Sequence, residues 1–377
     1  MSNDDAVGWV TAEAPARIDL SGGWSDTPPI TNEHGGVVTN VAVKVDGRKP
    51  IGAKIRKILE LELVLVVCCK ITNSQRTLRC TTLEDLKDYC NPAATGALLK
   101  TAFLCTKIVE LSSSAKPLAE QLQLKHGCGF EIHAWSYLPH GSGMGTSSIL
   151  AGVVCAAIWK ITSRNYDNQE LLHLVVELEQ MLTTGGGWQD QVGGLIPGVK
   201  ITTSPPGTAI KVFPKVLDVS GETLQKVTTN MALIYTGKTR LAKDLLQNVI
   251  KRWHAGTPEI VENVGNLTTN AESCADAWLQ GDLEKMALCL NTYRIQKKIM
   301  APDSEPEEIS KIINSITPHV HGCCFAGAGG GGFLFVITKQ PNIHKQLQEI
   351  LQNLSKQNNL YKVHKIEVDT EGLTLTE

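Results

Sequence analysis

The sequence has little of what marks several large classes of protein. Its 377 residues carry a formal net charge of −2 and only 5% aromatic residues. A charge this close to neutral gives no broad electrostatic case for a nucleic acid or an anionic membrane as partner. The longest apolar run, residues 149–159, is too short to cross a bilayer, and residues 1–10 are polar and acidic. We therefore expect a cytoplasmic protein.

The cysteines also lack a recognisable pattern. Eleven are present, without any CxxC pair and with two neighbouring pairs at 68–69 and 323–324. Zinc sites and disulfide frameworks use regular spacings that are missing here. The sequence therefore predicts free thiols, mostly buried, in a reducing compartment.

The length and composition suit a two-domain globular protein. Hydrophobic residues make up 42% of the chain and charged residues 20%. At a Pro-Pro-Gly turn near residue 204 the sequence changes to mainly helical patterns. This change predicts domains at 1–203 and 204–377. Strands and helices do not alternate regularly, which favours an α+β fold over a doubly wound sheet.

The hydrophobic patterns predict the following elements. Strands are expected at 7–14, 17–20, 36–46, 61–69, 130–137, 231–235, 333–338 and 361–368. Helices are expected at 83–90, 98–109, 169–184, 239–253, 259–280, 283–300 and 343–357. Thr81 and Glu84 predict a capping box, and Asp46-Gly47 predicts a solvated hairpin turn inside a basic cluster.

The most informative segment reads PHGSGMGTSSILAGVV, from Pro139 to Val154. Its alternating glycines allow backbone N–H groups to approach an anion closely, and the apolar run after them predicts a helix whose N-terminus adds positive potential. The hydroxyls that follow the glycines could reach a phosphate oxygen or its magnesium ion. We interpret the segment as a phosphate-binding loop; the alternative is a tight turn capped by Thr146 or Ser147.

Two commoner nucleotide motifs do not fit these residues. A Walker loop needs a lysine, and none lies between Trp135 and Lys160. The dinucleotide pattern GxGxxG would need glycine at Thr146. A formal GxGxxG occurs at residues 327–332, but a predicted strand follows it where a helix should, so a Rossmann site is excluded.

Three further segments hold residues that packing explains less well. Arg17 and Asp26 flank a Gly-Gly turn, although a surface strand residue and a turn cap would look the same. Glu179 lies on or beside an apolar helical face, with a solvated glutamate as the alternative. Asp190 follows three glycines that no packed core requires, so the backbone there is expected to bend around a ligand. The glycine-rich residues 326–332 predict a second anion-facing loop, with a tight turn between strands as the alternative.

These segments, in this order, resemble the motifs of the GHMP small-molecule kinases. The sequence APAR at 14–17 resembles the first motif, GSGMGTSS at 141–148 the second and AGAGGGG at 326–332 the third. The resemblance spans nearly the whole chain. It implies the two-domain GHMP kinase fold, with the nucleotide and sugar site in the cleft between the domains, and ATP and Mg²⁺ as cofactors.

The resemblance also implies roles for single residues. Asp190 would contact the attacking hydroxyl with Arg17 beside it, and Ser147 with Glu179 would hold magnesium. The implied sugar-binding residues are Asp26, Trp24, Trp188 and Gln189. The implied nucleotide-binding residues are Gly141, Ser142, Gly143, Met144, Gly145, Thr146, Ser147, Ser148, Gly329 and Gly330.

Within the family, GGWSDTPP at 22–29 and TTGGGWQDQVGG at 183–194 are most similar to the kinase domain of fucokinases, with bacterial heptose kinases next. Trp24 stands where galactokinases have a polar sugar contact, and an indole such as Trp24 or Trp188 suits the methyl group of a 6-deoxy sugar. The resemblance thus implies phosphorylation of the anomeric hydroxyl of L-fucose. A heptose 1-kinase and a non-catalytic sugar and ATP sensor are the alternatives. Fucokinases often carry a preceding nucleotidyltransferase-like domain. The resemblance therefore implies such a domain as a partner, either covalently attached to this chain or lost from it.

Overall fold

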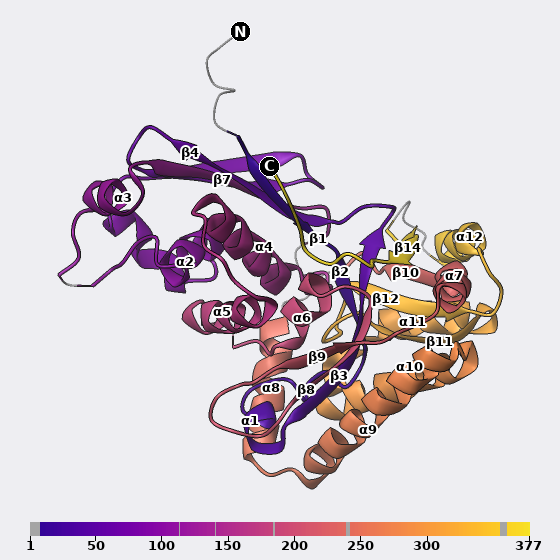
Figure 1. The fold of residues 1–377 in the computed structure, drawn as a ribbon. Helices are drawn as coiled ribbons and strands as arrows, with labels where there is room; N and C mark the ends of the chain where they lie inside the picture. The colour runs from indigo at the N-terminus through magenta and orange to yellow at the C-terminus, as the bar shows by residue number, and fades with distance from the viewer. Residues whose placement is uncertain (1–7, 113, 140, 184, 239–241, 355–359) are drawn as a thin grey trace.

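Three β-sheets and the helices that cover them make up the described part of the chain (Figure 1). The computed structural model describes residues 8–112, 114–139, 141–183, 185–238, 242–354 and 360–377. The sheets are mainly antiparallel, with β5 and β7 as a parallel pair. This mixed arrangement of helices and antiparallel sheets confirms the predicted α+β class.

The first sheet has six strands and belongs mostly to the N-terminal half. Its spatial order is β15 (Thr374–Thr376), β1 (Val10–Ala14), β4 (Ile51–Ile58), β7 (Gly129–Ser136), β5 (Leu63–Cys69) and β6 (Ser74–Cys80). In β4 the side chains alternate: Ile51, Ala53 and Ile55 are buried, whereas Lys54 and Arg56 lie on the opposite face. One face of the sheet is therefore apolar and needs a cover.

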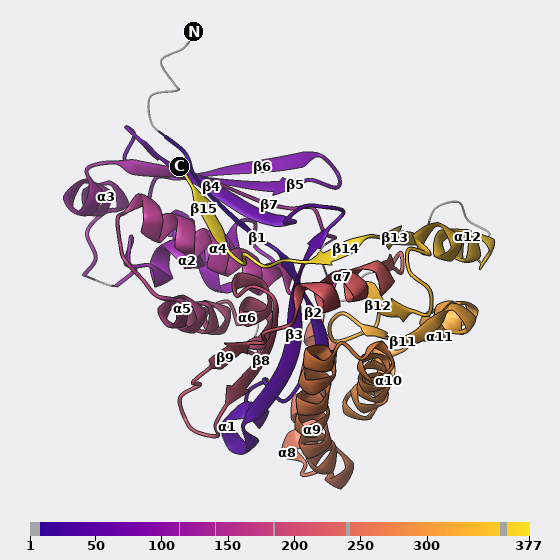
Figure 2. The ribbon, with the colours of Figure 1, turned by 45° about the vertical axis from the view of Figure 1, so that its right-hand side comes forward.

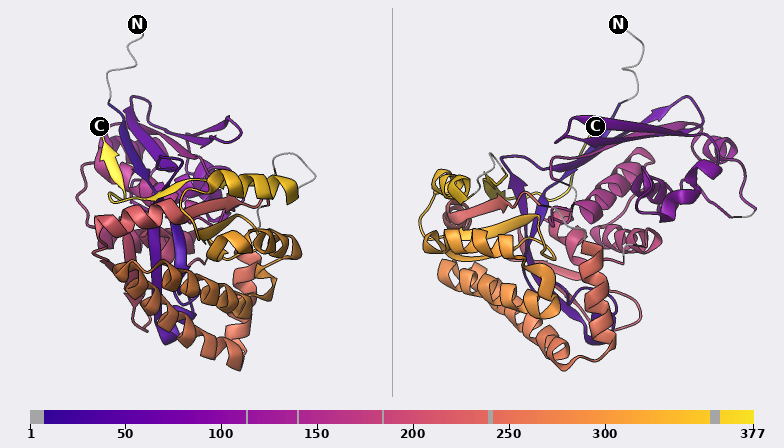
Figure 3. Two further views of the ribbon diagram at one scale, coloured as in Figure 1. Left: turned by 90° about the vertical axis from the view of Figure 1, so that its right-hand side faces the viewer. Right: turned by 180° about the vertical axis from the view of Figure 1, so that it is seen from behind.

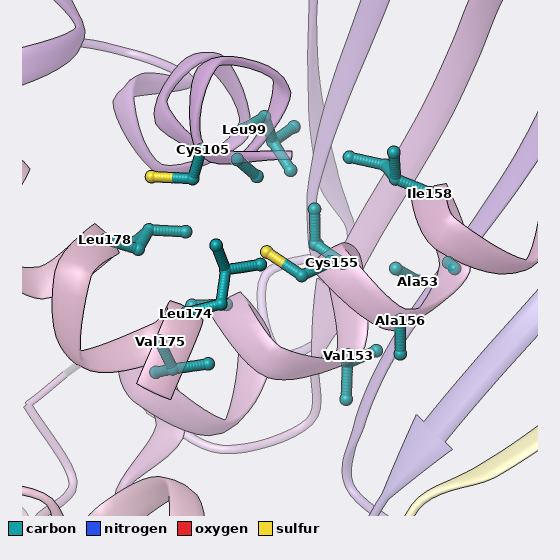
Figure 4. Packing of buried hydrophobic residues seen from close by; sticks show 14 of the residues in the cluster. Ala53, Leu99, Cys105, Val153, Cys155, Ala156, Ile158, Leu174, Val175 and Leu178 are labelled. Carbon is teal, nitrogen blue, oxygen red and sulfur yellow. The ribbon is translucent and has the colours of Figure 1, made fainter. Parts of the chain in front are cut away.

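Three helices supply that cover. They are α2 (Ala97–Cys105), α4 (Thr146–Ile161) and α5 (Asn168–Met181), and they lie below the sheet in Figure 1. Figure 4 shows how their side chains gather in one core, with Cys155 of α4 among residues of α2 and α5. Helix α4 is apolar on almost every side, which is typical of a central buried helix. Its N-terminus is consequently held in a fixed place.

The other two sheets are shared by distant parts of the chain. The second contains β2 (Ala16–Ser21), β3 (Gly36–Val45), β8 (Val199–Ser204), β9 (Phe213–Val216) and β14 (Ile366–Val368), with β3 bonded to β2, β8 and β14. The third has the order β11 (Val320–Phe325), β12 (Phe333–Thr338), β10 (Met231–Tyr235) and β13 (Lys362–His364).

Two long antiparallel helices pack beside these sheets. Helix α9 (Pro258–Gln280) contacts β3, and α10 (Leu283–Met300) contacts β11 and β2 (Figure 2). The remaining helices are α1 (Ile30–His34), α3 (Leu118–His126), α6 (Gln189–Leu195), α7 (Gly221–Asn230), α8 (Ala242–His254), α11 (Glu307–Ile316) and α12 (His344–Leu354), with 3-10 turns at Glu84–Cys90, Pro302–Ser304 and Thr317–His319. Across the described residues, every helix is too short or too polar to cross a membrane.

The two halves are interleaved rather than joined end to end. From behind, the six-stranded sheet with its helices lies on one side and the orange helical half on the other (Figure 3). Strands β2 and β3, from the first fifty residues, pack in the same core as α9 and α10. The C-terminal segment then returns to the first sheet, where β15 pairs with β1. The division at residues 203 and 204 falls inside β8 and stays a prediction.

Many predicted elements are confirmed. Strands β10 and β12 and helix α10 begin and end at the predicted residues. The other predicted ends that can be compared, in β1, β2, β3, β5, β7, α2, α5, α8, α9 and α12, are matched to within a few residues. The predicted start of β1 at 7, end of α5 at 184, start of α8 at 239 and end of α12 at 357 lie outside the described residues. Strand β4 was missed, because its basic residues lie on the face without a helical cover and hide the alternation.

Two local predictions are wrong, and a third is confirmed only at its turn. The capping box is not formed, because the carboxylate of Asp85 accepts from the backbone of Thr81 and Thr82. The exposed turn at Asp46-Gly47 is formed, with Val45 and Arg48 bonded to each other in both directions, but β3 and β4 diverge beyond it into different sheets. The strand expected at 361–368 is split between β13 and β14, which also belong to different sheets.

Candidate active site

The first glycine loop, residues 141–148, joins β7 to α4. Gly141, Gly143 and Gly145 have φ angles of +70°, +74° and +71°, a region that side chains rarely adopt. Gly145 is the N-cap of α4 without a side-chain cap, so the alternative of a cap by Thr146 or Ser147 is wrong. The amide groups from Gly143 to Ser148 have no acceptor among the described residues. Free amides at a helix N-terminus are suited to an anion.

The second glycine loop, residues 326–332, connects β11 to β12 and lies directly against the first. The amide of Phe333 donates to the carbonyl of Ser142 over 3.2 Å. A side chain at Gly332 would collide with that same carbonyl, and one at Gly327 would collide with the backbone of Gly143. Glycine is therefore required for the close approach of the two loops. The strand that follows, β12, confirms that this loop is not a Rossmann motif.

An arginine of β2 joins both loops to an aspartate of α6. The Nε and Nη2 atoms of Arg17 donate to Oδ1 of Asp190 over 2.9 and 2.6 Å. Its Nη1 donates to the carbonyls of Gly143, over 2.8 Å, and of Ala326. Burial alone would lower the pKa of Arg17, but the carboxylates of Asp190 and Asp19 outweigh it and raise that pKa. The guanidinium is thus a permanent cation that fixes one oxygen of Asp190.

Asp190 keeps contact with solvent although its partner is buried. Its side chain is 31% exposed, against 4% for Arg17. It is the second residue of α6, and the first, Gln189, also reaches the predicted site. A carboxylate that is oriented from one side and open on the other is suited to accept a proton from a bound hydroxyl.

A second carboxylate, Asp26, lies beside this pair and is buried. Its oxygens accept from the amides of Trp24, over 3.1 Å, and Gln189, over 3.2 Å, and from Nε2 of Gln189 over 3.1 Å. Burial, and next the charge of Asp190, raise the pKa of Asp26 to about 7. Any side chain at Gly187 would collide with this carboxylate, which explains one glycine of the run before α6.

The predicted magnesium ligands occupy different positions in the fold. Glu179, on α5, is buried and accepts from the hydroxyl of Ser148 over 2.8 Å. Ser147, named with Glu179 from the sequence, is exposed on the first turn of α4. One residue along a helix turns the side chain by about 100°, so the packing of α5 on α4 selects Ser148 as the partner.

These oxygens fit magnesium only as part of a larger ligand set. In the part of the chain that the structure describes, no three His, Cys, Asp or Glu side chains gather as a cation site. Magnesium commonly binds one or two protein oxygens together with substrate phosphates and water. The Ser148 and Glu179 oxygens, beside the first glycine loop, match that donor chemistry.

The two predicted indoles are part of the core. Trp24, with φ of +79°, is 7% exposed and packs in the core shared by β2, α9 and α10. Trp188, the N-cap of α6, is 1% exposed and donates from Nε1 to the hydroxyl of Thr31 over 3.2 Å. Both flank the Asp26 and Gln189 pair, so they shape its surroundings from the buried side.

Sequence reasoning missed three buried groups next to Arg17. Asp19 lies two residues along β2, and it contacts Tyr293 and Lys297 of α10. Asp19 could have been found, because residues two apart on a strand share a face. Tyr293 and Lys297 carry no local signal within a long helical pattern.

Two hollows of the surface lie away from these residues. One of about 430 Å³ is lined by residues of β3 and β8 with Phe213, and another of about 520 Å³ surrounds the turn between β3 and β4. Neither is lined by the loops, by Arg17 or by Asp190. The candidate site is therefore identified by its chemistry rather than by the size of a hollow.

Two glycine loops that lie against each other, one at a helix N-terminus, and an aspartate oriented by an arginine are an arrangement chemically suited to a phosphorylated ligand. The comparisons with known proteins agree. Residues 111–196 match the model of the GHMP kinases N terminal domain. The chain belongs to the GHMP kinase family.

Two curated relatives cover most of the chain. It is 31% identical over 344 residues to the bifunctional fucokinase/GDP-fucose pyrophosphorylase of Arabidopsis thaliana. That alignment covers 90% of this chain and 31% of the Arabidopsis protein. The chain is 30% identical over 348 residues to the L-fucokinase/L-fucose-1-P guanylyltransferase of Bacteroides fragilis, covering 92% and 36%. The chain thus spans about a third of the length of these relatives.

The fold matches solved structures of the same family. The galactokinase of Lactococcus lactis, solved in complex with galactose, superposes with a TM-score of 0.69 at 15% identity, over 98% of this chain and 95% of that one. This likeness confirms the predicted fold.

Proposed function

We propose that this protein is an ATP-dependent sugar kinase that phosphorylates the anomeric hydroxyl of L-fucose, giving β-L-fucose 1-phosphate and ADP. The observation that carries the proposal is the Arg17–Asp190 pair, which joins a proton acceptor to both glycine loops through one guanidinium. The similarity to two fucokinases supports fucose as the sugar.

The reaction forms a bond between the anomeric oxygen and the γ-phosphorus and breaks the bond between that phosphorus and the β,γ-bridging oxygen. Asp190 orients the anomeric hydroxyl and accepts its proton as the new bond forms. A carboxylate is a weak base, so the transfer is expected late. Arg17 holds Asp190 in one orientation.

The free amides of the first glycine loop and the N-terminus of α4 bind the phosphate groups of ATP and stabilise the charge of the loose transition state. Gly329 and Gly330 of the second glycine loop are proposed to contact the nucleotide as well. Ser148 and Glu179 would hold magnesium, which neutralises phosphate charge when bound. Ser147, exposed on the same turn, is the weaker candidate for that role.

Asp26 and Gln189 are proposed to bind the sugar hydroxyls. Their mutual hydrogen bonds place a carboxylate and an amide next to Asp190. Trp24 and Trp188 pack behind them and would set the apolar side of the pocket, which suits a methyl group in place of a hydroxyl.

The test is ADP release with ATP and magnesium across L-fucose, D-arabinose, D-galactose, heptose 7-phosphate and mevalonate. We expect L-fucose to be turned over fastest and D-arabinose more slowly, because it lacks the methyl group. Faster turnover of the heptose would favour a heptose kinase. Binding of sugar and ATP without any ADP would instead indicate a sensor, and both results would overturn the proposal.

A further inference from the structure

A buried lysine near the end of α10 holds the start of the second glycine loop. The ammonium group of Lys297 donates to the carbonyl of Phe325 over 2.9 Å and to that of Gly327 over 2.8 Å. Its side chain is 1% exposed. A fully desolvated ammonium needs such acceptors, since an unpaired buried charge is costly.

The same lysine is paired with a carboxylate of the strand that carries Arg17. Asp19 Oδ2 lies 3.0 Å from the Lys297 ammonium and accepts from the hydroxyl of Tyr293, and Asp19 is 2% exposed. The ammonium also lies 4.1 Å from the centre of the Tyr293 ring. Asp19 and Arg17 share one face of β2, so the two cations reach the loop from neighbouring positions.

Together the two cations occupy three successive carbonyls. Phe325 and Gly327 accept from Lys297, and Ala326, between them, accepts from Arg17. With these carbonyls engaged, the amides of Gly327, Ala328 and Gly329 have no acceptor among the described residues. The contacts fix the loop where it enters from β11, next to Gly143 of the first glycine loop.

Gly23 lies where the Asp19, Tyr293 and Lys297 cluster approaches the proposed sugar-binding residues, and there is no room for a side chain at this position. A side chain at Gly23 would collide with the hydroxyl of Tyr293 and approach both Asp19 Oδ2 and Gln189 Nε2. The Asp19, Tyr293 and Lys297 cluster is therefore packed against the same turn that carries Asp26.

From these contacts we propose that Asp19 and Lys297 are positioning residues of the kinase. Their ion pair fixes the second glycine loop against the first and keeps Arg17 in the orientation that reaches Asp190. Lys297 acts on the loop carbonyls directly, and Asp19 acts through Lys297 and Tyr293. This inference rests on the proposed nucleotide-dependent function of the two loops, and it adds residues that contact neither substrate.

A purely structural ion pair would behave differently, and a double variant separates the two cases. Removal of one partner from a buried pair leaves an unpaired charge, whereas neutral replacement of both is often tolerated. The test compares Lys297→Met, Asp19→Asn, the double variant and Tyr293→Phe. Lys49→Met is the control, since Lys49 is half-buried, with a side chain 8% exposed, and pairs with Asp369 and Glu371 near the first sheet.

Three measurements are made on each protein: the melting temperature, the dissociation constant for ADP by calorimetry, and kcat with L-fucose. We expect Lys297→Met to lose both stability and function. The double variant should regain most of the stability, but its ADP affinity and kcat should stay about tenfold or more below the wild type, because two loop carbonyls have lost their donor. Lys49→Met should keep the ADP affinity and kcat of the wild type.

A stable double variant with wild-type ADP affinity and kcat would overturn the inference. If Lys297→Met does not fold, the double variant and Tyr293→Phe decide the result. If the wild type binds ADP but does not turn over L-fucose, the proposed substrate fails, while the ADP affinities still judge the positioning role.

Discussion

The two glycine loops lie against each other but reach their conformations by different means. The first is continuous with α4, a helix buried on almost every side, and its left-handed glycines lead straight into the first helical turn. The second lies between two strands, and Arg17 and Lys297 hold its carbonyls from elements far away in the sequence.

The conformation of the first loop is thus determined mainly by residues close in sequence, and that of the second mainly by contacts from distant residues. Free amides at the first loop follow from glycine spacing and a helix start, which any reader of the sequence can see. Free amides at the second loop depend on cations that engage the carbonyls beside them. The first loop should therefore tolerate distant changes that disturb the second.

The largest expected effect is at the residue that both loops reach through Arg17. Asp190→Asn keeps an oxygen for the guanidinium but removes the proton acceptor, so kcat should fall by about 10²- to 10⁴-fold. ADP release at saturating substrate measures this, with sugar affinity by calorimetry as the control. Near-native turnover with normal sugar binding would exclude the proposed role.

Close packing of the loops is tested by Gly332→Ala, with Gly127→Ala as the matched control. Both glycines have positive φ, +77° and +66°, but only the side chain at 332 would meet the backbone of Ser142, whereas that at 127 meets open space. We expect the control to lose about 1 kcal/mol of unfolding free energy and Gly332→Ala a few kcal/mol. Denaturant unfolding measures both, and equal losses would contradict the collision.

The metal assignment at the first loop is sharpened by two adjacent serines. Ser148→Ala removes the hydroxyl that donates to Glu179, while Ser147→Ala changes an exposed side chain. The magnesium concentration for half-maximal rate should rise about tenfold in Ser148→Ala and Glu179→Gln and little in Ser147→Ala. If that magnesium concentration rises more in Ser147→Ala than in Ser148→Ala, Ser147 and not Ser148 would be the magnesium ligand.

The smallest effect is a pH dependence from Asp26, which contacts Gln189 next to Asp190. With a pKa of about 7, its ionised form is lost as the pH falls through 7, so kcat/KM for the sugar should decline there. The raised pKa also means that the folded state holds the proton more tightly, so stability should fall as pH rises from about 4 to about 7.

Two variants check this assignment of the pH dependence. Asp26→Asn should abolish the stability change, and Asp19→Asn should move the kinetic decline to lower pH, because the charges of Asp190 and Asp19 both raise the pKa of Asp26. Profiles identical to the wild type in both variants would remove Asp26 as the titrating group.

Several parts of the site could be predicted because their signals are local. The glycine loops, Arg17 and Asp190 stand in short segments whose composition is unusual for packed structure, and the structure brings them together. Helix α10 was predicted to the residue from its helical pattern, and the side chain of Asp282 caps its start. The residues on α10 that matter for the site could not be singled out by the same pattern.

Other features depend on choices between equivalent local options. Ser147 and Ser148 are alike in sequence, and the pairing of Glu179 with Ser148 depends on how α5 lies on α4. Residues 361–368 are one apolar pattern, yet β13 and β14 bond to different sheets, because the chain passes from the third sheet to the second there.

The sequence by itself determined where the backbone bends, where α4 begins and which residue types could serve phosphate and sugar chemistry, because glycine, helix and turn preferences act over a few residues. Tertiary structure alone decided that Lys297 meets Asp19 and that Arg17 meets both loops, since these pairs are separated by more than a hundred residues and form only when the second and third sheets pack in one core with α9 and α10.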